Sequence, residues 1–411
     1  MPVLQSAFGA VAVILLFSEM DGKRVSRGRR NKAQSYYKMD SESLGNLTLY
    51  GGFLIIHSEM QDELVWWVAL HMVRGVGPVQ FRSLCDDYGS PREVFRNAGR
   101  LKNRNLGEAI AGFDLKRAER QLKVASEYGA AIITYEDDAY PANLRQFEYS
   151  PPLLFVLGDE KSGEKSVAIV GTRKPTSYGL RQAARFAEVI AESGCSVISG
   201  GARGIDTQAH VAALRAGGKT IVVLGSGLDR PYPRENRKLF DEIVGSGGAI
   251  VTEFPFGTKP YPCNFLRRNR IISGMADLLV VVEAGRRSGA LNTASWAQAQ
   301  GKEVFALPGP VDSKASFGTN SLIKRGAMLA QSPGDILFAL GISRPQRKLE
   351  PDLRGTEKKI YECLSEEPLH VDQIARKLSI EVVDLLVYLL SLELKGYVVQ
   401  LPGKYFRRST L

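Results

Sequence analysis

Short runs of valine, isoleucine and leucine recur between residues 167 and 330, and each run ends in a turn of small and polar residues. The runs begin at Val167, Ser196, Thr220, Leu278 and Glu303. None of them alternates between apolar and polar residues, which is typical of strands buried on both faces of a parallel sheet. Helix-like segments of ten or more residues separate most of the runs. The pattern therefore predicts a doubly wound α/β sheet with helices on both faces.

The pattern changes on both sides of this region. Residues 61–130 have a helical period, and we assign them to a helical N-terminal domain that precedes a sheet domain at 131–340. A charged, proline-bearing linker follows at 341–354. Residues 355–406 predict three helices and a hairpin, which is the order of a winged helix. Residues 1–60 show no sustained period, and we expect a poorly ordered extension there.

The third helix of the predicted winged helix is unusual for a DNA reader. It runs from Val382 to Leu394, is apolar almost all round, and carries no arginine or lysine before Lys395. A helix that enters a major groove should offer Arg, Lys, Asn or Gln to the base edges. The sequence therefore favours a structural or protein-contact role for this helix.

Net charge and cysteine usage narrow the class of partner and the compartment. Among 411 residues, 54 are Lys or Arg and 44 are Asp or Glu, a formal net charge of +10 that favours a polyanionic partner. The four cysteines and four histidines show no metal-ligand spacing, so we expect no metal site and a cytoplasmic protein. The apolar run at 7–17 is too short for a comfortable membrane span. The basic residues that follow it, between 23 and 32, fit a solvated arm or a DNA contact.

Familiar nucleotide-binding and hydrolytic motifs are missing. The chain has no GxxxxGK[ST], no GxGxxG and no GxSxG motif. A P-loop ATPase is thereby excluded, and a dinucleotide cofactor and a serine hydrolase elbow are not indicated. We therefore expect no cofactor.

The small residues all follow the predicted strands, so the candidate chemistry gathers at one place. Turns at Gly171, Gly200, Gly225 and Gly285 are expected at the carboxyl edge of the sheet, where open α/β sheets bind ligands. Backbone N–H groups in such turns and at helix N-termini suit phosphate. Arg173 can pair with a phosphate through two hydrogen bonds.

Two further features of this region allow alternative interpretations. Asp206 and His210 stand four residues apart at the start of a predicted helix. They could form a catalytic acid–base pair, or Asp206 could simply cap the helix; we favour the cap. The Gly-x-Gly at Gly75–Gly77 fits a helix-hairpin-helix turn that binds a DNA phosphate, or a tight turn between packed helices. The packing interpretation is favoured for Gly75–Gly77.

Residues 264–270 form the densest basic and aromatic element of the chain. Three arginines occur within four residues beside Phe265, which are the groups needed to follow a phosphodiester backbone and stack a base. The alternative is that Phe265 is a core residue and the arginines pair with Asp241, Glu242 or Glu253. We favour DNA contact.

Taken in order, these motifs closely resemble the DNA-processing protein A family, also called DprA or Smf. The matching stretches are Val170–Arg173, Ser199–Asp206 with His210, Gly225–Pro233 with Asn236, Asn264–Ile272, Arg287–Ala294, Pro308–Gly309, Gly318–Asn320 and Leu322–Ala327. The resemblance spans about 60–406 and is most specific over 167–330. One departure is Leu266, where the family has proline, so we expect a less rigid loop and a less secure stacking role for Phe265.

The resemblance implies a function and a set of binding residues. The family has an extended Rossmann-like domain that binds single-stranded DNA, hands it to the RecA recombinase in natural transformation and self-associates into dimers. A helical N-terminal domain of the helix-hairpin-helix or SAM-like type and a C-terminal winged helix flank it. No catalytic activity and no membrane are implied. The implied DNA contacts are Gly171, Thr172, Arg173, Gly200, Gly201, Arg203, Gly204, Lys219, Asn264, Phe265, Arg267, Arg268, Asn269, Arg270, Ser288 and Gly289.

The opposing hypothesis is an enzyme of the lysine-decarboxylase-like phosphoribohydrolase type, which has a similar sheet and binds nucleoside monophosphates. Such enzymes need a PGGxGTxxE-type loop whose glutamate helps to cleave the glycosidic bond. The corresponding stretch here, Ser288–Trp296, contains no acidic residue. That difference favours the non-enzymatic function.

Overall fold

The computed structural model describes residues 47–50, 53–56, 59–159, 165–342, 353–365 and 367–408. The chain forms two compact units, residues 1–344 and residues 345–411, and each is described by itself. The predicted linker and most of the predicted N-terminal extension, with its apolar and basic runs, lie outside the described residues. Within that extension the structure adds an unexpected antiparallel hairpin of β1 (Leu47–Tyr50) and β2 (Phe53–Ile56).

The first unit begins with the predicted helical segment. Its elements are α2 (Glu59–Met72), α3 (Pro78–Tyr88), α4 (Pro91–Arg96), η2 (Ala98–Arg100), α5 (Arg104–Ala111) and α6 (Lys116–Glu127). Local chemistry sets the boundaries, since Ser90 caps α4 by accepting a hydrogen bond from the Glu93 N–H at 3.3 Å. Gly75 turns the chain between α2 and α3 at φ +95°, a conformation that favours glycine.

A nine-stranded sheet follows, and it confirms the α/β prediction. Its strands are β3 (Ala131–Thr134), β4 (Leu153–Gly158), β5 (Ser166–Val170), β6 (Ser196–Ser199), β7 (Thr220–Val223), β8 (Ala249–Thr252), β9 (Leu278–Val281), β10 (Val304–Ala306) and β11 (Met328–Leu329). The spatial order is β11-β10-β9-β5-β6-β7-β8-β4-β3. The strands from β11 to β8 are parallel, whereas β4 pairs antiparallel with both β8 and β3.

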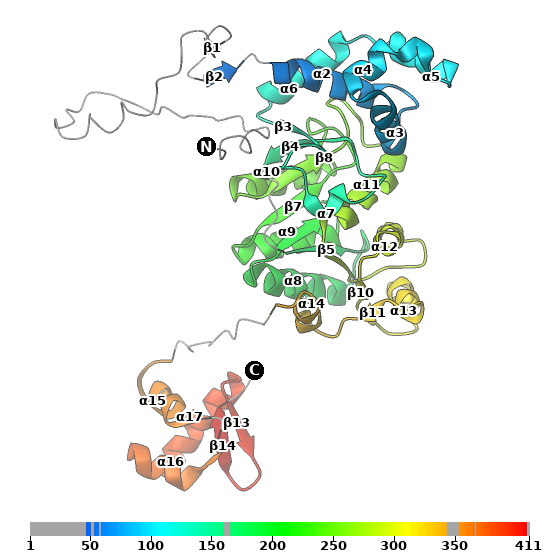
Figure 1. The fold of residues 1–411 in the computed structure, drawn as a ribbon. Helices are drawn as coiled ribbons and strands as arrows, with labels where there is room; N and C mark the ends of the chain where they lie inside the picture. The colour runs from blue at the N-terminus through cyan, green and yellow to red at the C-terminus, as the bar shows by residue number, and fades with distance from the viewer. Residues whose placement is uncertain are drawn as a thin grey trace, which may run out of the picture. The chain divides into compact units, whose positions relative to one another are not determined.

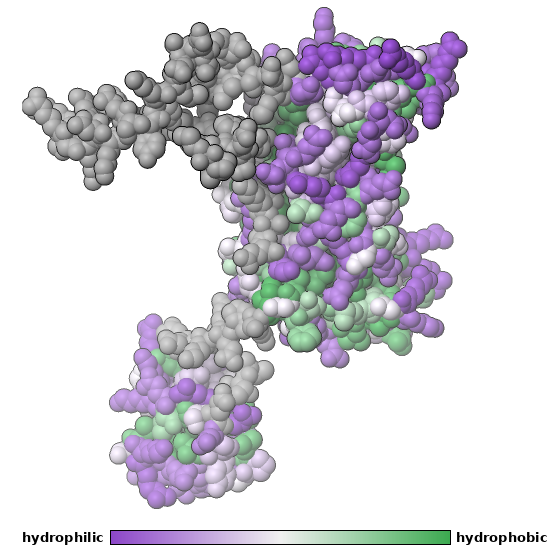
Figure 2. Space-filling view, viewed as in Figure 1, coloured by the Kyte–Doolittle hydropathy of each residue, from purple (hydrophilic) through white to green (hydrophobic). Residues whose placement is uncertain are grey.

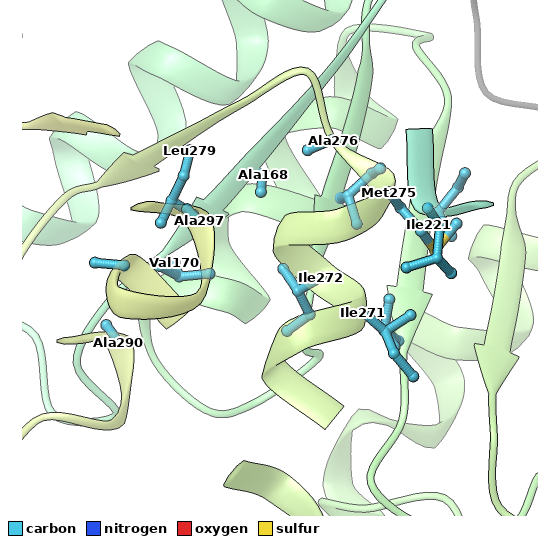
Figure 3. Packing of buried hydrophobic residues seen from close by; sticks show 14 of the residues in the cluster. Ala168, Val170, Ile221, Ile271, Ile272, Met275, Ala276, Leu279, Ala290 and Ala297 are labelled. Atoms are coloured by element: carbon cyan, nitrogen blue, oxygen red, sulfur yellow. The ribbon is translucent and has the colours of Figure 1, made fainter. Parts of the chain in front are cut away.

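Helices cover both faces of the parallel strands (Figure 1). One face carries α8 (Ser177–Glu192) and α9 (Ile205–Arg215), and the other carries α11 (Pro262–Met275) and α12 (Gly289–Ala299). Alternate residues of β5 belong to separate cores: Val167 and Ile169 pack with α8 and α9, and Ala168 and Val170 pack with α11 and α12. Figure 3 shows Ile271 and Ile272 of α11 within the second of these cores. The remaining elements of the unit are α7 (Ala142–Arg145), η3 (Arg234–Asn236), α10 (Arg237–Gly245), α13 (Phe317–Lys324) and α14 (Pro333–Ala339).

The helical segment and the sheet share one core. Trp67 of α2 stacks near Phe81 of α3 and Tyr135 after β3, with ring centroids 5.2 and 4.9 Å apart. The same buried cluster includes Phe155 of β4 and Phe240 of α10. The segment that we predicted as a separate N-terminal domain is therefore packed into the sheet unit.

The second unit is the predicted winged helix. It consists of α15 (Gly355–Cys363), β12 (Leu369–His370), α16 (Val371–Leu378), α17 (Val382–Leu394), β13 (Val398–Leu401) and β14 (Tyr405–Arg408). Its strands are antiparallel in the order β12-β14-β13. The third helix, α17, buries Leu385, Leu389 and Leu392. Its opposite side leaves large apolar residues exposed, and hydrophobic residues reach the visible surface of this unit (Figure 2).

Within the described part of the chain, the longest helices are too short and too polar to cross a membrane.

Candidate nucleic-acid interface

The glycine turns lie along one edge of the sheet, as the sequence predicts. Strands β9, β5, β6 and β7 are consecutive and parallel, so their carboxyl ends meet at the same edge. The turns at Gly285, Gly171, Gly200 and Gly225 follow these four strands in that spatial order. The sheet therefore gathers the predicted binding loops into one row.

A buried carboxylate fixes the loop that follows β5, from Gly171 to Thr176. Glu283, two residues after β9, accepts hydrogen bonds from the Thr176 N–H at 2.8 Å and the Thr176 hydroxyl at 2.7 Å. Its backbone carbonyl accepts from the Thr172 N–H at 2.7 Å. The loop from Gly171 to Thr176 is thereby held against β9 and α8. Sequence reasoning missed Glu283, although an acidic residue directly after an apolar strand is a usable signal.

Arg173 projects from this fixed loop and is exposed. Its guanidinium carbon lies 5.4 Å from the centroid of the Phe265 ring, close enough for a cation–π interaction. It makes no ion pair within the described residues. Its hydrogen-bonding capacity is therefore open to an anionic ligand.

Phe265 stands at the start of α11, and this is a correction to the predicted loop. Residues 264–270 are helical, because Pro262 occupies the first turn of α11 and presets the helical backbone. Leu266 sits on the outer side of that helix and is 51% exposed. The missing proline therefore does not leave a loose loop.

Phe265 is half-buried and forms one wall of a narrow pocket of about 40 Å³. A Cβ atom at Gly225 would lie 2.8 Å from its ring, so glycine is required for the ring to rest there. The Tyr232 ring lies 5.6 Å from it, centroid to centroid. We call this pocket the sheet-edge site, and its lining includes Arg173, Arg203, Tyr232, Phe265 and Arg268.

Arg268, which we predicted as a DNA contact, lines the sheet-edge site but is buried there. Its residue is 3% exposed, and its Nη1 donates to the carbonyl oxygens of Gly200, at 2.7 Å, and of Val223. Burial lowers the pKa of Arg268 to about 10, against the opposing effect of the nearby Asp206 carboxylate. A side chain at Gly200 would collide with this guanidinium, since a Cβ there would lie 2.7 Å from Nη2.

Arg270 and Asn269 are likewise buried, which corrects the expectation that both contact DNA. Arg270 is 4% exposed and holds the buried Glu253 carboxylate through Nη1 at 2.6 Å and Nη2 at 2.8 Å. Asn269 donates to the Asn292 side chain at 3.1 Å. The alternative that these arginines pair with Glu253 is thus correct for Arg270 and also for Arg267, whose half-exposed side chain reaches Glu253 at 2.7 Å.

Glu253 joins three elements at this place. Burial alone would raise the pKa of its carboxyl group, but Arg270 and Arg267 together hold that pKa below its usual value. Its backbone carbonyl lies 2.8 Å from Nε2 of His71 at the end of α2. The end of β8, the start of α11 and the helical segment are therefore fixed to one another.

Two of the predicted DNA contacts, Lys219 and Arg203, form ion pairs with acidic residues of the protein. Lys219 precedes β7 and so lies at the opposite edge of the sheet, where it pairs with Asp159 at 2.8 Å. The structure does not bring it to the sheet-edge site. Arg203 lines the site but forms an exposed ion pair with Glu235.

The remaining predicted residues surround the sheet-edge site. Gly204 has φ +81° and packs so closely that a Cβ would lie 2.5 Å from the Thr172 carbonyl oxygen. Gly201 adjoins Gly200 in the same turn and also has a positive φ. Asn264 is half-buried one residue before Phe265.

The predicted pair Ser288 and Gly289 opens α12 at the end of β9. The Ser288 hydroxyl accepts a hydrogen bond from the Ala290 N–H at 3.3 Å and caps the helix. Asn269 donates to the Gly289 carbonyl at 3.4 Å, which links the beginnings of α12 and α11. These contacts place Ser288 and Gly289 next to the sheet-edge site rather than within its lining.

Asp206 and His210 are both internal. Asp206 accepts a hydrogen bond from the Ala202 N–H at 3.3 Å, and burial raises its pKa to about 6 although Arg268 opposes the shift. His210 Nδ1 lies 2.7 Å from the Thr220 hydroxyl, and burial lowers its pKa to about 3. Asp206 thus binds the backbone of the turn before α9 from within the first turn of that helix, while the N-cap position itself is Gly204.

No group of three or more His, Cys, Asp or Glu side chains able to hold a metal ion occurs among the residues that the structure describes.

Comparison with known proteins shows which family the chain belongs to. The model of the family described as DNA recombination-mediator protein A matches residues 131–341, and the DprA winged helix domain matches residues 344–404. The chain belongs to the DNA recombination-mediator protein A family. The first matched segment covers the strands of the sheet within the first unit, and the second covers most of the winged helix. Together they confirm the family resemblance read from the motifs.

Curated relatives and a solved structure agree with this membership. The chain is 34% identical to Protein Smf of Synechocystis over 400 residues, which cover 84% of this chain and 99% of the relative. It is 38% identical to Protein Smf of Escherichia coli, over 73% of this chain and 83% of the relative. The X-ray structure of DNA processing protein A from Streptococcus pneumoniae aligns with a TM-score of 0.57 and 30% identity, over 67% of this chain and 96% of that one. Membership of this family supports a role in DNA recombination and transformation.

Proposed function

We propose that the protein binds single-stranded DNA at the carboxyl edge of its sheet and helps to load the RecA recombinase onto it, in natural transformation and recombination. The observation that carries the proposal is the sheet-edge site itself. An exposed arginine without an ion pair in the described chain, Arg173, stands over a half-buried aromatic ring, Phe265, beside glycine-lined turns. Those are the groups that hold a phosphate and stack an unpaired base.

The fixed support around Arg173 and Phe265 strengthens the proposal. Glu283 holds the Arg173 loop, and Arg268 holds the turn at Gly200 from below. A site whose side chains are already positioned loses less conformational entropy when a flexible strand binds. The buried arginines thus serve the interface by positioning its exposed members.

Binding is non-enzymatic in this proposal. The loop from Arg286 to Trp296 contains no glutamate or aspartate, so the sheet edge lacks the acid–base group of a phosphoribohydrolase. The protein then acts in the cytoplasm, with no cofactor and away from the membrane. The sheet domain would also form the homodimer that the family resemblance implies.

The test is a competition measurement by fluorescence anisotropy. A labelled oligothymidylate is displaced by unlabelled single-stranded DNA, duplex DNA or a mononucleotide. We expect single strands to compete best, with a log–log salt slope of about −0.7 for each neutralised phosphate. Equal competition by duplex DNA, or binding that does not depend on salt, would contradict the proposal.

The RecA step needs a separate readout. We expect the protein to increase the rate at which RecA assembles on single-stranded DNA, and Arg173→Ala to abolish that increase. Arg181→Ala is the matched control, because Arg181 is an exposed arginine on α8 outside the sheet-edge site. An unchanged assembly rate with the wild-type protein would limit the function to DNA binding.

A further inference from the structure

A second basic cleft lies between the helical segment and the loop after β8. Its volume is about 600 Å³, within the range of roughly 300–1,000 Å³ that is usual for ligand sites. The end of α2, the Gly75 turn, α6 and residues 254–258 form its walls. We call it the helical cleft, and its cationic lining consists of Arg74, Arg117, Arg120 and Arg267.

The charge in the helical cleft is unbalanced. Arg74 and Arg117 are exposed and form no ion pair within the described residues, and Arg120 approaches Asp114 only to 3.9 Å. The one acidic residue in the lining is Glu253, whose buried carboxylate is already held by Arg267 and Arg270. A cleft with several cations and a neutralised acid attracts an anionic ligand.

Burial lowers the pKa of His71, the remaining titratable group in the lining, even though Glu253 opposes the shift. Its ring contacts the Glu253 carbonyl oxygen. His71 is therefore a neutral residue that helps to hold the wall of the cleft. The positive charge of the cleft comes from its arginines.

The helical cleft and the sheet-edge site both take lining residues from the first turns of α11. Phe265 lines the sheet-edge site, and Arg267, two residues later, lines the cleft. Between them Leu266 is 51% exposed, and Tyr261 just before the helix is 55% exposed. The same short segment therefore contributes residues to both sites and carries exposed apolar and aromatic side chains of its own.

Two of the four cleft arginines pair with an aromatic ring, and one of those rings, Phe254, itself lines the cleft. The guanidinium of Arg267 lies 5.5 Å from the Phe254 ring centroid, and that of Arg117 lies 5.3 Å from the Phe113 centroid. Arginine planes and rings provide stacking surfaces for bases, whereas an acidic peptide would use only the charge. This repetition favours a nucleic acid as the occupant.

We propose that the helical cleft binds the phosphodiester backbone of the same single strand that the sheet-edge site holds, and so extends the DNA-binding path by several nucleotides. The inference rests on the proposed function, since the strand enters through the sheet-edge site. Glu253 contacts both Arg267 and His71 at the end of α2, so these parts of the cleft wall are held in place before DNA arrives. The Gly75–Gly77 turn, for which packing was favoured, then also lies beside the DNA path.

The experiment compares a short and a long oligothymidylate, of roughly four and about sixteen nucleotides. The cleft variant is Arg74→Glu with Arg117→Glu. Its control is Arg100→Glu with Arg104→Glu, which makes the same change in net charge on exposed residues of the same segment outside the cleft. Thermal melting checks that both variants are folded.

We expect the cleft variant to bind the long oligonucleotide at least about tenfold more weakly and the short one normally. Its salt slope for the long oligonucleotide should be less steep by about 1.4, two phosphates at 0.7 each. Normal binding of the long oligonucleotide, or an equal loss in the control variant, would overturn the inference.

Two further arms separate the possible failures. Arg173→Ala should weaken both oligonucleotides; if it binds both normally, the proposed function itself fails. If Arg173→Ala is impaired but the cleft variant is not, only the helical cleft is wrongly assigned. A poly-glutamate peptide that binds the wild type and not the cleft variant, with equal DNA affinities, would assign the cleft to an acidic protein and overturn the proposal.

Discussion

Helices α11 and α17 distribute charge and hydrophobicity in opposite ways. Helix α11 carries three arginines in four residues, yet it buries Arg268 and Arg270 and exposes Leu266. Helix α17 is almost entirely apolar, yet it exposes Val383 to 74% and Leu394 to 82%. Residue type alone therefore does not decide which side chains meet solvent. In α11 the deciding factor is a set of buried acceptors, namely Glu253 and the backbone carbonyls at the strand ends.

The comparison also separates two kinds of arginine within one helix. A guanidinium that is fully paired inside the protein stabilises the fold, whereas one that reaches solvent can be used for binding. Arg270 and Arg267 share the same carboxylate but differ in exposure, at 5% and 46% of their side-chain surfaces. They are the natural pair for testing the distinction.

The largest expected effect is that of Arg270→Ala. Removing it leaves Glu253 buried with only Arg267 as a charged partner, and breaking a buried ion pair costs about 3–5 kcal/mol. Denaturant unfolding should show this loss. Arg267→Ala should reduce stability far less and DNA binding more. Equal losses of stability in the two variants would remove the distinction between supporting and contacting arginines.

Asp206 and His210 should change the stability of the folded protein in opposite directions as the pH falls. The folded-state pKa of Asp206 is raised to about 6, so the folded protein takes up this proton first, and stability is gained as the pH falls from 6 towards 4. The folded-state pKa of His210 is lowered to about 3, so the unfolded chain takes up its proton first, and stability is lost below about 6.5. The two contributions oppose each other in the wild type.

Asp206→Asn removes only the stabilising contribution. The stability of this variant should therefore fall more steeply than that of the wild type between pH 6.5 and 4, by roughly 2–3 kcal/mol over the range. Melting temperatures at several pH values provide the measurement. Parallel pH profiles would show that Asp206 is not protonated in the folded protein.

Arg173→Ala should weaken single-strand binding at least about tenfold, because hydrogen bonds to charged groups contribute about 1.5–3 kcal/mol. The melting temperature should hardly change, since Arg173 is exposed and forms no ion pair in the described chain. Arg268→Ala should instead reduce stability, because its guanidinium fills buried hydrogen-bonding positions. An Arg173 variant that unfolds would mean that this arginine supports the loop.

Phe265→Ala should have a more modest effect on binding. Loss of a stacked base costs about 1–3 kcal/mol, but Arg173 and Tyr232 already occupy space beside the ring. Phe265→Tyr is the conservative control and should bind nearly as the wild type does. Binding titrations with an oligothymidylate would give both values, and normal binding by the alanine variant would make Phe265 a packing residue.

The smallest effect is expected from removal of the winged helix. A chain that ends at Arg344 keeps the whole of the sheet-edge site and of the helical cleft. Its affinity for single-stranded DNA should stay within about twofold of the full chain, because α17 offers apolar rather than basic side chains. A loss comparable to that of Arg173→Ala would give the winged helix a direct part in DNA binding.

The fold was largely predictable because its signals are periodic. The unbroken apolar runs correctly predicted five of the parallel strands. The glycines after the runs predicted which edge of the sheet carries the binding loops. Strands β8 and β11 were missed, since β11 has only two residues and β8 lies close before a loop of prolines and aromatics. Because β8 was not predicted, the position of Glu253 directly after this strand was not predicted either.

The site was only partly predictable, because burial depends on residues far away in the chain. The residues from Arg267 to Arg270 look like a binding patch until their acceptors are known, and those acceptors come from Gly200, Val223 and Glu253. Lys219 could have been excluded from the sequence, because it precedes its strand and so belongs to the other edge. Arg173 follows its strand and remains a predicted contact.

The hydrogen bond between His71 and Glu253 has a consequence for how the chain folds during synthesis. It joins residues 182 positions apart, and the buried cluster that contains Trp67 extends to residues as late as Phe240 and Phe256. At about 5–20 residues per second, the ribosome needs roughly 10–40 s to release those partners after α2 has emerged. Trp67 can pack on Phe81 and Tyr135 as soon as these have emerged, whereas His71 and the side of the helical segment that meets the later residues must wait. We therefore expect chaperones on the nascent chain to bind that side.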